Sequence, residues 1–294
     1  MRCFRFRLPL TNAIQLDDET FHHREGLLLE SEGLWAEASP LPHFSSETIE
    51  DVIAALRNKT ATPPSLRFAL DCLEQPMTDC SVPLNSLLVA GRLAVDKDFA
   101  AVKLKVGRQS VAEDVAIVRQ VHDQLQPHQA LRLDANRAWS YEQATTFAKA
   151  IESISIQYIE EPLQSPTELE QLHTETGLPY ALDETLTEDL PLDDFPNAVA
   201  MVLKPTLLGG RTRIAELAAL GKPLVFSAAF ESGVGITRIA QRAWEFARDV
   251  PCGLDTYSWL AEDMLKERLA VRNGRLFVAA DLKINSRRLE EVEL

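Results

Sequence analysis

The sequence predicts an α/β protein, a (β/α)7β barrel of the TIM type preceded by an N-terminal α+β capping domain. The first observation is that short apolar runs alternate with helical patterns from residue 83 onward. The second is that six of these runs end in a polar or charged residue, and the third is a strand-rich pattern before residue 83. Alternating parallel strands and helices form such barrels, whose active sites lie at the carboxyl ends of the strands.

The predicted capping domain covers residues 1–82. The runs CFRFRLPL and REGLLLESEGLWAEASPL have the pattern of antiparallel strands. The following SSETIEDVIAAL predicts a helix with Ser45 as its N-cap. Between the strands, residues 11–25 (TNAIQLDDETFHHRE) are predicted to form a capping loop, in which His22 and His23 face solvent or belong to a lid rather than bind a metal.

The predicted barrel covers residues 83–269. Its eight apolar runs are LNSLLVA, AVKLKVG, ALRLDAN, IQYIEEP, YALDET, AVAMVLKP, PLVFSAA and CGLDTY. Successive strand ends from Lys105 to Ser227 lie 29, 26, 23, 21 and 23 residues apart, the length of a βα unit. An open doubly wound sheet is the alternative, but no G-x-G-x-x-G turn occurs, since GVGITR has Arg238 in the last place. The tail 270–294 contains NGRLFV, which predicts a turn into one more strand.

Composition excludes several classes of partner. The 294-residue chain is 46% hydrophobic and has a formal net charge of −14, which disfavours nucleic acid and anionic membranes because both need a positive surface. No window approaches an 18-residue apolar span, and MRCFRFRLPL lacks the apolar core of a signal peptide. The four cysteines lack metal-binding spacing and are predicted to be small buried residues. We therefore expect a cytoplasmic protein.

Three carboxylates end three successive predicted strands: Asp134, Glu160 and Asp183. Each one alone is explained as the N-cap of the following helix. Together they would converge at the barrel mouth and raise one another's pKa values, unless a cation compensates them. Oxygen-only ligands with open positions suit Mg²⁺.

Lysines flank this acidic series. Lys103 and Lys105 share one face of their strand because side chains alternate with period two, so Leu104 is predicted to point outward. Lys204 follows a strand on the opposite side of the barrel. A buried lysine with a depressed pKa can remove a proton next to a carboxylate, and a metal stabilises the resulting enediolate. The sequence thus predicts proton abstraction from a carbon acid.

These motifs resemble the enolase superfamily, in particular its muconate-lactonizing subgroup. The resemblance runs from about Gly26 to Tyr257 and rests on KLK, DAN, IEEP, LDET and LKPTLLGG in order. It implies that the acids of the preceding series bind Mg²⁺, with Mn²⁺ as a substitute. It also implies that Lys105 is the catalytic base, that Lys103 and Lys204 stabilise the enediolate, and that neighbouring groups support the ligands: Glu161, Glu184 and Asn136.

Within the superfamily, LRLDANRAW, ALDETL and WAEASPLPHFSSET resemble members that dehydrate 2-succinyl-6-hydroxy-2,4-cyclohexadiene-1-carboxylate to o-succinylbenzoate, in menaquinone or phylloquinone biosynthesis. A small-molecule carboxylate is therefore the expected substrate. The predicted contacts are Arg132, Ser227, Ala228 and Ser232, together with backbone N–H groups at the head of the helix that follows. The run FSAAFESGVG departs from the serine-rich pattern that the resemblance implies there.

Two alternatives stay open. A racemase of N-acylated amino acids or an epimerase of dipeptides would use the same metal and both Lys105 and Lys204. Dipeptide epimerases resemble one another in a D-x-D motif at the eighth strand, where this chain has Asp255 and Tyr257. A catalytically silent binding barrel is more remote, because no lysine or acid of the pattern is missing.

Overall fold

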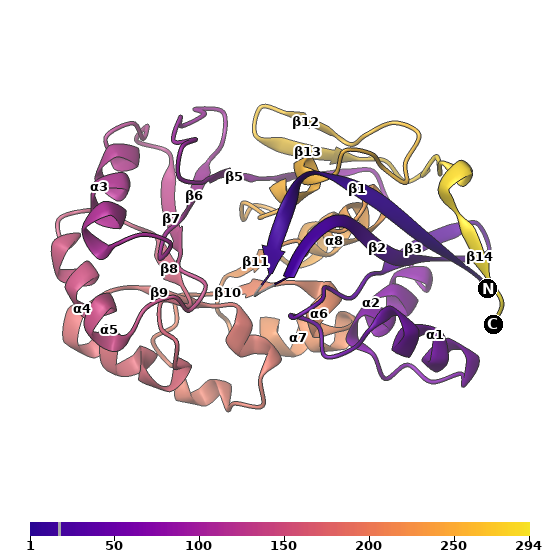
Figure 1. The fold of residues 1–294 in the computed structure, drawn as a ribbon, viewed down its shortest axis with the longest axis horizontal. Coiled ribbons are helices and arrows are strands. Elements are labelled where there is room, and N and C mark those ends of the chain that lie inside the picture. The colour runs from indigo at the N-terminus through magenta and orange to yellow at the C-terminus, as the bar shows by residue number, and fades with distance from the viewer. Residues whose placement is uncertain (17–18) are drawn as a thin grey trace.

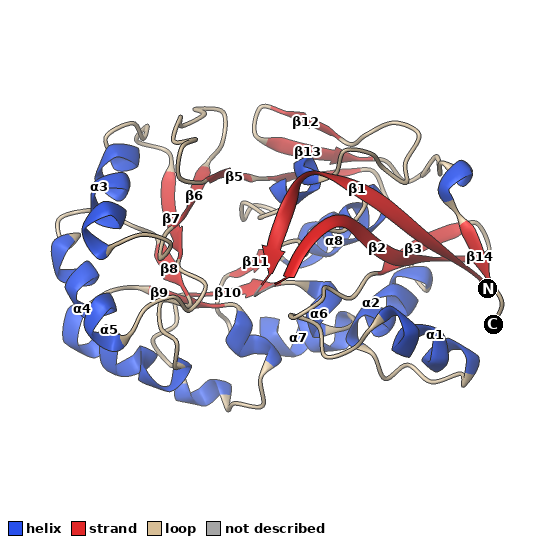
Figure 2. Cartoon of the chain, in the orientation of Figure 1, coloured by secondary structure: helices blue, strands red, loops and turns tan. Residues whose placement is uncertain are grey.

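A computed structural model describes residues 1–16 and 19–294, which form three β-sheets with helices around them (Figures 1 and 2). Four antiparallel strands make the cap sheet, seven parallel strands make the barrel, and three further strands join the two. The predicted combination of a parallel barrel and an N-terminal cap is therefore confirmed. No helix among the described residues is long and apolar enough to cross a membrane.

The cap sheet has the strand order β14-β1-β2-β3. Its strands are β1 (Arg2–Leu16), β2 (Glu19–Ser31), β3 (Leu34–Ala38) and β14 (Glu290–Val292), and the cap helices are α1 (Ile49–Arg57) and α2 (Pro64–Leu73). Phe6, Leu27 and Leu29 are fully buried in one core cluster with Phe68 of α2. Since β14 pairs with β1, the two chain termini lie together at the cap end of the molecule (Figure 1).

The prediction of a capping loop at residues 11–25 is corrected by the structure, which has strands there. Apart from residues 17 and 18, which lie outside the described part, residues 11–25 extend β1 and β2 into a long hairpin. Its register shifts between Pro9 and Ile14, and the outer part reaches the barrel, where Leu10 pairs with Leu260. This part of the hairpin is mostly exposed, so its strands carry many polar residues and the sequence pattern resembles that of a loop. His22 and His23 are exposed, as expected.

The N-cap of α1 is also corrected. Thr48 caps the helix: its hydroxyl accepts from the Asp51 N–H, and the Asp51 carboxylate accepts from the Thr48 N–H. Such a reciprocal capping box satisfies two helix N–H donors at once. Ser45 instead uses its hydroxyl to accept from the Leu41 N–H in the turn before.

Seven parallel strands form the barrel, in the sheet order β11-β10-β9-β8-β7-β6-β5. They are β5 (Asn85–Leu88), β6 (Ala101–Lys105), β7 (Ala130–Asp134), β8 (Tyr158–Glu160), β9 (Tyr180–Leu182), β10 (Ala200–Leu203) and β11 (Leu224–Phe226). The helices between and after them are α3 (Val111–His122), α4 (Tyr141–Ala150), α5 (Leu169–Thr176), α6 (Pro205–Leu208), α7 (Arg211–Ala219) and α8 (Gly233–Phe246). Each strand from β6 to β11 ends at its predicted polar residue or directly before it, whereas β5 ends at the apolar Leu88.

The eighth predicted strand, CGLDTY, is reduced to two residues that close the ring. Cys252 forms a parallel bridge with Leu84 and donates to the Pro83 carbonyl. Gly253 bridges Ser227 on the other side and donates to the Phe226 carbonyl. The chain then enters a 3-10 turn from Asp255 to Trp259. Backbone hydrogen bonds on both sides thus join the first and last strands of the parallel sheet.

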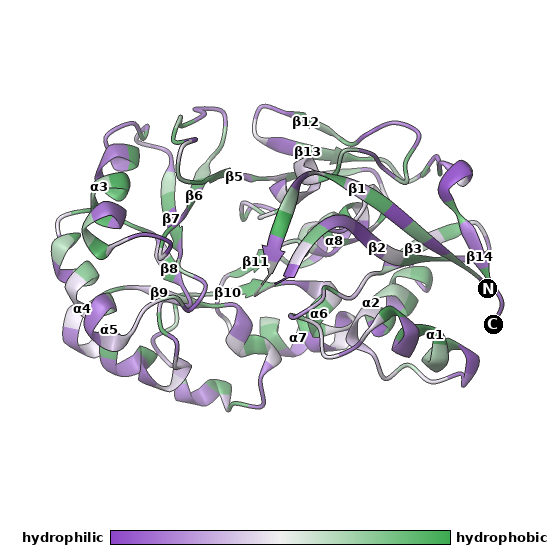
Figure 3. Cartoon of the chain, viewed as in Figure 1, coloured by the Kyte–Doolittle hydropathy of each residue, from purple (hydrophilic) through white to green (hydrophobic). Residues whose placement is uncertain are grey.

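Two separate apolar layers hold the barrel together. Leu104 and Leu133 point outward into the large core beneath the helices, whereas Tyr158, Ala181 and Val202 belong to a second cluster. Residues of opposite parity on the strands fill the two layers, as the alternation of side chains requires. Helices α3, α4 and α5 lie outside the strands and carry both hydrophobic and hydrophilic patches (Figures 1 and 3). The predicted outward position of Leu104 is therefore confirmed.

The tail of the chain pairs first with β4 (Cys80–Pro83) and then, through β14, with β1 of the cap sheet. Its hairpin consists of β12 (Ala270–Arg272) and β13 (Arg275–Val278), and β13 pairs with β4. The strand β4 thus lies between the cap helices and the first barrel strand. All four cysteines are buried and free, as expected.

Candidate active site

A cavity of about 540 Å³ lies at the carboxyl ends of the barrel strands and is covered by the cap. The barrel contributes the ammonium groups of Lys103, Lys105 and Lys204 and the carboxylate of Asp134. The cap contributes Ile14 of the hairpin together with two residues of the segment after β3, Leu41 and Phe44. Residues from both ends of the sequence therefore enclose the charged groups that the sequence singled out.

Lys103 lies between two carboxylates on the neighbouring strands. Its Nζ is 2.7 Å from Asp134 Oδ2 and 2.5 Å from Glu160 Oε2. Strand register explains the contact, because Lys105 pairs with Asp134 and Asp134 pairs with Glu160 across β6, β7 and β8. Lys105 Nζ is 2.6 Å from the same Asp134 oxygen and 2.5 Å from Asn136 Oδ1. Four predicted site residues, Lys103, Lys105, Asp134 and Glu160, and one predicted supporting residue, Asn136, thus meet.

On the other side of the mouth, Lys204 donates to Asp183. Asp183 directly follows β9 and Lys204 directly follows β10, so their side chains reach the mouth from adjacent strands. The two pairs place ammonium groups on both sides of the carboxylates. This is the arrangement that the sequence predicted for Lys105 and Lys204.

Burial and neighbouring charges shift the pKa values of the three carboxylates in different directions. Burial disfavours the ionised form of Asp134, but the Lys103 and Lys105 ammonium groups outweigh it and hold the pKa well below the usual range. Burial raises the pKa of Glu160 to about 8, and Asp134 adds to this effect. Burial also raises the pKa of Asp183 to about 6. The acids therefore carry less negative charge than three free carboxylates would.

The lysines also differ from one another. Burial lowers the pKa of Lys105, with the positive charge of Lys103 acting in the same direction and Asp134 opposing it. The pKa of Lys204 is raised, since Asp183 and Glu184 outweigh the effect of burial. The pKa of Lys103 is raised well above its usual value, because two carboxylates outweigh the burial of its ammonium group. Lys105 is therefore the lysine of the three that most readily supplies a neutral amine.

Glu161 holds the loop that carries Asp183. Its Oε1 accepts from the N–H groups of Asp183 and Thr185 at 2.9 and 3.0 Å, and its Oε2 accepts from Arg137. Glu161 is fully buried and adopts a positive φ of 37°. Such conformations are uncommon for residues other than glycine. The predicted supporting role of Glu161 agrees with these contacts.

Glu184 and Asn136 connect the two sides of the mouth. Asn136 Nδ2 donates to Glu184 Oε1, while the Asn136 carbonyl oxygen accepts from Lys105. Glu184 Oε2 is buried without a hydrogen-bond partner. A buried carboxylate oxygen without a donor is costly and indicates a missing positive group.

The donor set fits a hard divalent cation. Asp134, Glu160 and Asp183 are oxygen donors that are at most 5% exposed, and burial raises the pKa values of Glu160 and Asp183. Among the described residues no group of three or more His, Cys, Asp or Glu side chains is placed to hold a metal, and the Lys103 ammonium contacts both Asp134 and Glu160. A metal between them would require the Lys103 ammonium to turn aside. Oxygen-only donors of this kind favour Mg²⁺ or Mn²⁺.

Of the four residues predicted to contact the substrate, two line the cavity and two lie outside it. Ser227 and Ala228 line the cavity. Arg132 is 1% exposed and lies deeper in the barrel, where it donates to Gln157 and to the Pro251 carbonyl and stacks on Tyr158. Arg132 faces the barrel interior, as its strand position requires. It precedes Asp134 by two residues, however, and therefore does not line the cavity.

Ser232 is the second of the two residues that lie outside the cavity. It is fully buried as the N-cap of α8, and both its N–H and its hydroxyl donate to Glu37 of the cap. The Gly235 N–H also donates to Glu37, and the Gly233 N–H donates to Asp263. These helix N–H groups are therefore taken by carboxylates of the chain itself and do not bind the substrate carboxylate.

Sequence reasoning missed the acids that fasten the cap to the barrel wall. Glu37 binds the start of α8, and Glu231 accepts from the Ala229 N–H and from the Thr206 hydroxyl, which follows Lys204 by two residues. Both acids are buried, and Arg24 of β2 lies near them and donates to the Pro40 carbonyl. The only sequence signal was an acid within an apolar strand, WAEA.

Comparisons with known proteins agree with this geometry. Residues 88–281 match the family model described as "Enolase C-terminal domain-like", and residues 1–75 match "MenC, N-terminal domain". The fold and the lysine–carboxylate mouth thus define a member of the enolase superfamily, and the chain belongs to that family. Within it, the chain belongs with the o-succinylbenzoate synthases.

The relatives differ in length. The o-succinylbenzoate synthase of Klebsiella pneumoniae (strain 342) is 31% identical over 90% of this chain and 92% of its own length. Protein PHYLLO, chloroplastic, of Arabidopsis thaliana is 36% identical over 72% of this chain, but the match spans only 14% of that much longer protein.

Two solved structures share the fold. The o-succinylbenzoate synthase of Thermosynechococcus elongatus BP-1, solved with Mg in its active site, has a TM-score of 0.73 at 24% identity and covers 90% of this chain and 96% of its own. The L-Ala-D/L-Glu epimerase of Bacillus subtilis has a TM-score of 0.77 at 16% identity and covers 96% of each chain. Because a dehydratase and an epimerase both match, the fold alone does not decide between these reactions.

The raised pKa values predict that Mg²⁺ binding strengthens with pH. Protons compete with the metal at Glu160 (pKa about 8) and Asp183 (pKa about 6), so affinity rises as both lose their protons. We expect the Kd measured by calorimetry to fall between about pH 5.5 and pH 8.5, with proton release on binding. A Glu160→Gln control should lose the upper part of this dependence. An unchanged Kd across the range would contradict the prediction.

Proposed function

We propose that this protein is an o-succinylbenzoate synthase, a lyase that dehydrates 2-succinyl-6-hydroxy-2,4-cyclohexadiene-1-carboxylate on the route to menaquinone or phylloquinone. The observation that carries the proposal is Lys105, a lysine with a lowered pKa in a covered cavity beside carboxylates suited to a metal. The relatives named o-succinylbenzoate synthase, which match nearly the full length of the chain, support the substrate. We propose that residues 83–269 form the catalytic unit and residues 1–82 with 270–294 the cap.

In this proposal Lys105 acts twice. Its neutral amine takes the proton from the ring carbon that bears the carboxylate, and the electron pair moves onto the carboxylate as an enediolate. When the electrons return, they form the ring double bond and break the C–O bond of the adjacent carbon. Lys105 then returns the proton to the departing hydroxyl, which leaves as water. One residue serves as base and as acid.

The other lysines stabilise charge. Lys103 and Lys204 have raised pKa values and stay protonated, so they oppose the negative charge of the enediolate from two sides. We propose that Asp134, Glu160 and Asp183 would hold Mg²⁺, or Mn²⁺ in its place, which when bound supplies Lewis-acid stabilisation of that charge. Glu161, Glu184 and Asn136 would orient these groups. Ser227 and Ala228 line the wall that faces the substrate.

The residues of the eighth barrel segment favour a dehydratase over a dipeptide epimerase. Asp255 lines the cavity, but the Tyr257 hydroxyl points away and donates to Asp263. A dipeptide substrate carries an ammonium group that needs a second acid there, and this segment does not supply one. An acidic, lysine-rich mouth with a single acid at this position suits a substrate without an amine.

An assay on a substrate panel tests the proposed function. We expect turnover of the cyclohexadiene carboxylate, followed by the change in ultraviolet absorbance on aromatisation, and loss of turnover with EDTA that Mg²⁺ reverses. L-Ala dipeptides and N-succinyl amino acids, followed by circular dichroism, serve as the epimerase and racemase arms. Faster turnover of either arm than of the cyclohexadiene would overturn the assignment.

Lys105→Ala tests the role of the base. Because the same amine takes and returns the proton, we expect kcat to fall by more than about 10⁴-fold, beyond the usual effect of one acid–base group. The exposed Lys97, changed to Ala, is the matched control and should keep wild-type kcat. A loss of only about tenfold in Lys105→Ala would show that another residue is the base.

A further inference from the structure

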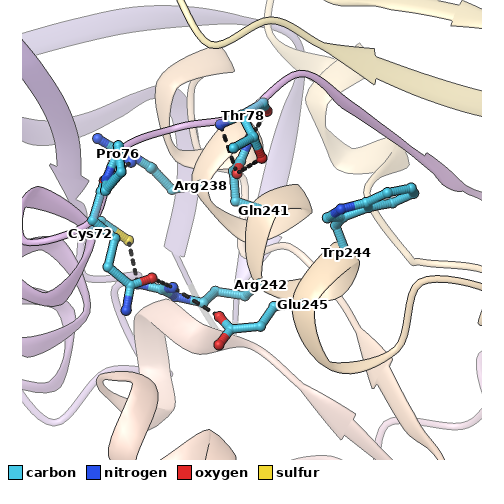
Figure 4. Close-up of a pocket in the computed structure, with 9 residues that line it drawn as sticks. Cys72, Pro76, Thr78, Arg238, Gln241, Arg242, Trp244 and Glu245 are labelled. Carbon is cyan, nitrogen blue, oxygen red and sulfur yellow. Dashed lines mark hydrogen bonds and ion pairs between the residues drawn. The ribbon is translucent and has the colours of Figure 1, made fainter.

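A second cavity, of about 170 Å³, lies where the linker between cap and barrel meets α8 (Figure 4). Its walls come from the end of α2 and the following linker, with Cys72 and Gln75, and from α8, with Arg238, Arg242 and Glu245. It shares no lining residue with the cavity at the barrel mouth. Nothing in the proposed reaction uses it.

Two buried guanidinium groups border this cavity. Arg238 and Arg242 are 3% and 4% exposed and lie one helical turn apart on α8. Like charges four residues apart on a helix repel each other. Burial lowers the pKa of Arg238, and Arg242 contributes to the shift. The pair is therefore held together against its own repulsion.

Carboxylates compensate the charge of the two guanidinium groups only in part. Arg238 donates to the backbone carbonyls of Trp35 and Gln75, and no carboxylate among the described residues forms an ion pair with it. Arg242 contacts Glu245, but the same carboxylate also accepts from Arg211. One carboxylate is therefore shared between two guanidinium groups, and Arg238 has none.

Donors are also left over. Arg238 Nη2 and Arg242 Nε are buried without any hydrogen-bond partner. The Cys72 sulfur lies 4.0 Å from Arg242 Nη2, but burial raises the pKa of this thiol, so it remains neutral and does not supply the missing charge. Buried charges are normally paired, and an unpaired one is costly.

We propose that this cavity binds a small tetrahedral oxyanion of the phosphate or sulfate class between Arg238 and Arg242. Guanidinium groups bind such oxyanions through paired charge-assisted hydrogen bonds, which would use the free nitrogens after a small turn of the side chains. The cavity volume of about 170 Å³ admits one such ion together with a few water molecules, each of which takes up about 30 Å³. Gln75, Thr78 and Gln241 supply neutral polar groups at the wall. The bound ion would fasten the linker to α8.

Phosphate binding to the whole protein tests the site. In buffer free of other oxyanions and at constant ionic strength set with NaCl, we expect inorganic phosphate to raise Tm saturably and to bind once per chain by calorimetry. Sulfate should compete and chloride should not. Arg238→Gln should weaken binding at least tenfold, whereas the exposed Arg272→Gln, with the same change of charge, should leave it intact.

Equal responses in wild type and Arg238→Gln would show a general salt effect and overturn the proposal, as would a lack of saturable binding to wild type. If Arg238→Gln does not fold, a wild-type crystal soaked in selenate decides. Anomalous density between Arg238 and Arg242 supports the site, and density absent there overturns it. Dehydratase activity is a separate readout, so failure of the proposed function would leave this result unaffected.

Discussion

The contact on which the site depends is that of Lys103 with Asp134 and Glu160. A single ammonium group, 8% exposed, lies within hydrogen-bond distance of both acids in the ring of parallel strands. Without it, two carboxylates on paired strands would face each other at low dielectric. The same contact keeps Lys103 protonated, and its charge in turn helps to lower the pKa of Lys105. One lysine therefore both compensates the buried acids and favours the neutral form of Lys105.

The cap is fastened to the barrel by buried acids rather than by apolar packing alone. Glu37 of β3 takes N–H groups at the start of α8, and Glu231 links the Ala229 backbone to Thr206. Ala228 and Ala229 line the cavity directly before these contacts in the chain, and the Ala229 N–H itself donates to Glu231. The cap thus sets the shape of the cavity by holding the wall as well as by covering the mouth. A helix N-terminus that binds anions in many enzymes is here used for assembly.

The sequence contained most of the site because charged residues interrupt apolar strands. The strand ends at Lys105, Asp134 and Glu160 follow from that interruption and from the repeat length. In the structure Lys105 contacts Asp134, and Lys103 contacts both Asp134 and Glu160. The two-residue eighth strand was harder to foresee, since closure depends on backbone hydrogen bonds to Pro83 and Phe226 and not on side-chain pattern.

The predictions for Arg132, Ser232 and Ser45 differ from the structure for physical reasons. Alternation along β7 indicates that Arg132 faces inward, but not that it lies beneath the cavity. A serine before a helix predicts a cap for Ser232, but its partner Glu37 is 195 residues away in the chain and no local pattern names it. Ser45 and Thr48 both suit an N-cap, and only the reciprocal bond with Asp51 decides between them.

In this structure the lysine ammonium groups hold the acids that we propose as ligands of a divalent metal. A crystal structure of the protein with Mn²⁺, using the anomalous signal of the metal, tests this proposal most directly. We expect one metal bound by Asp134, Glu160 and Asp183, with Lys103 turned away from at least one of the two acids that it contacts in this structure. Metal bound elsewhere, or no metal with Lys103 still between Asp134 and Glu160 at saturating Mn²⁺, would contradict it.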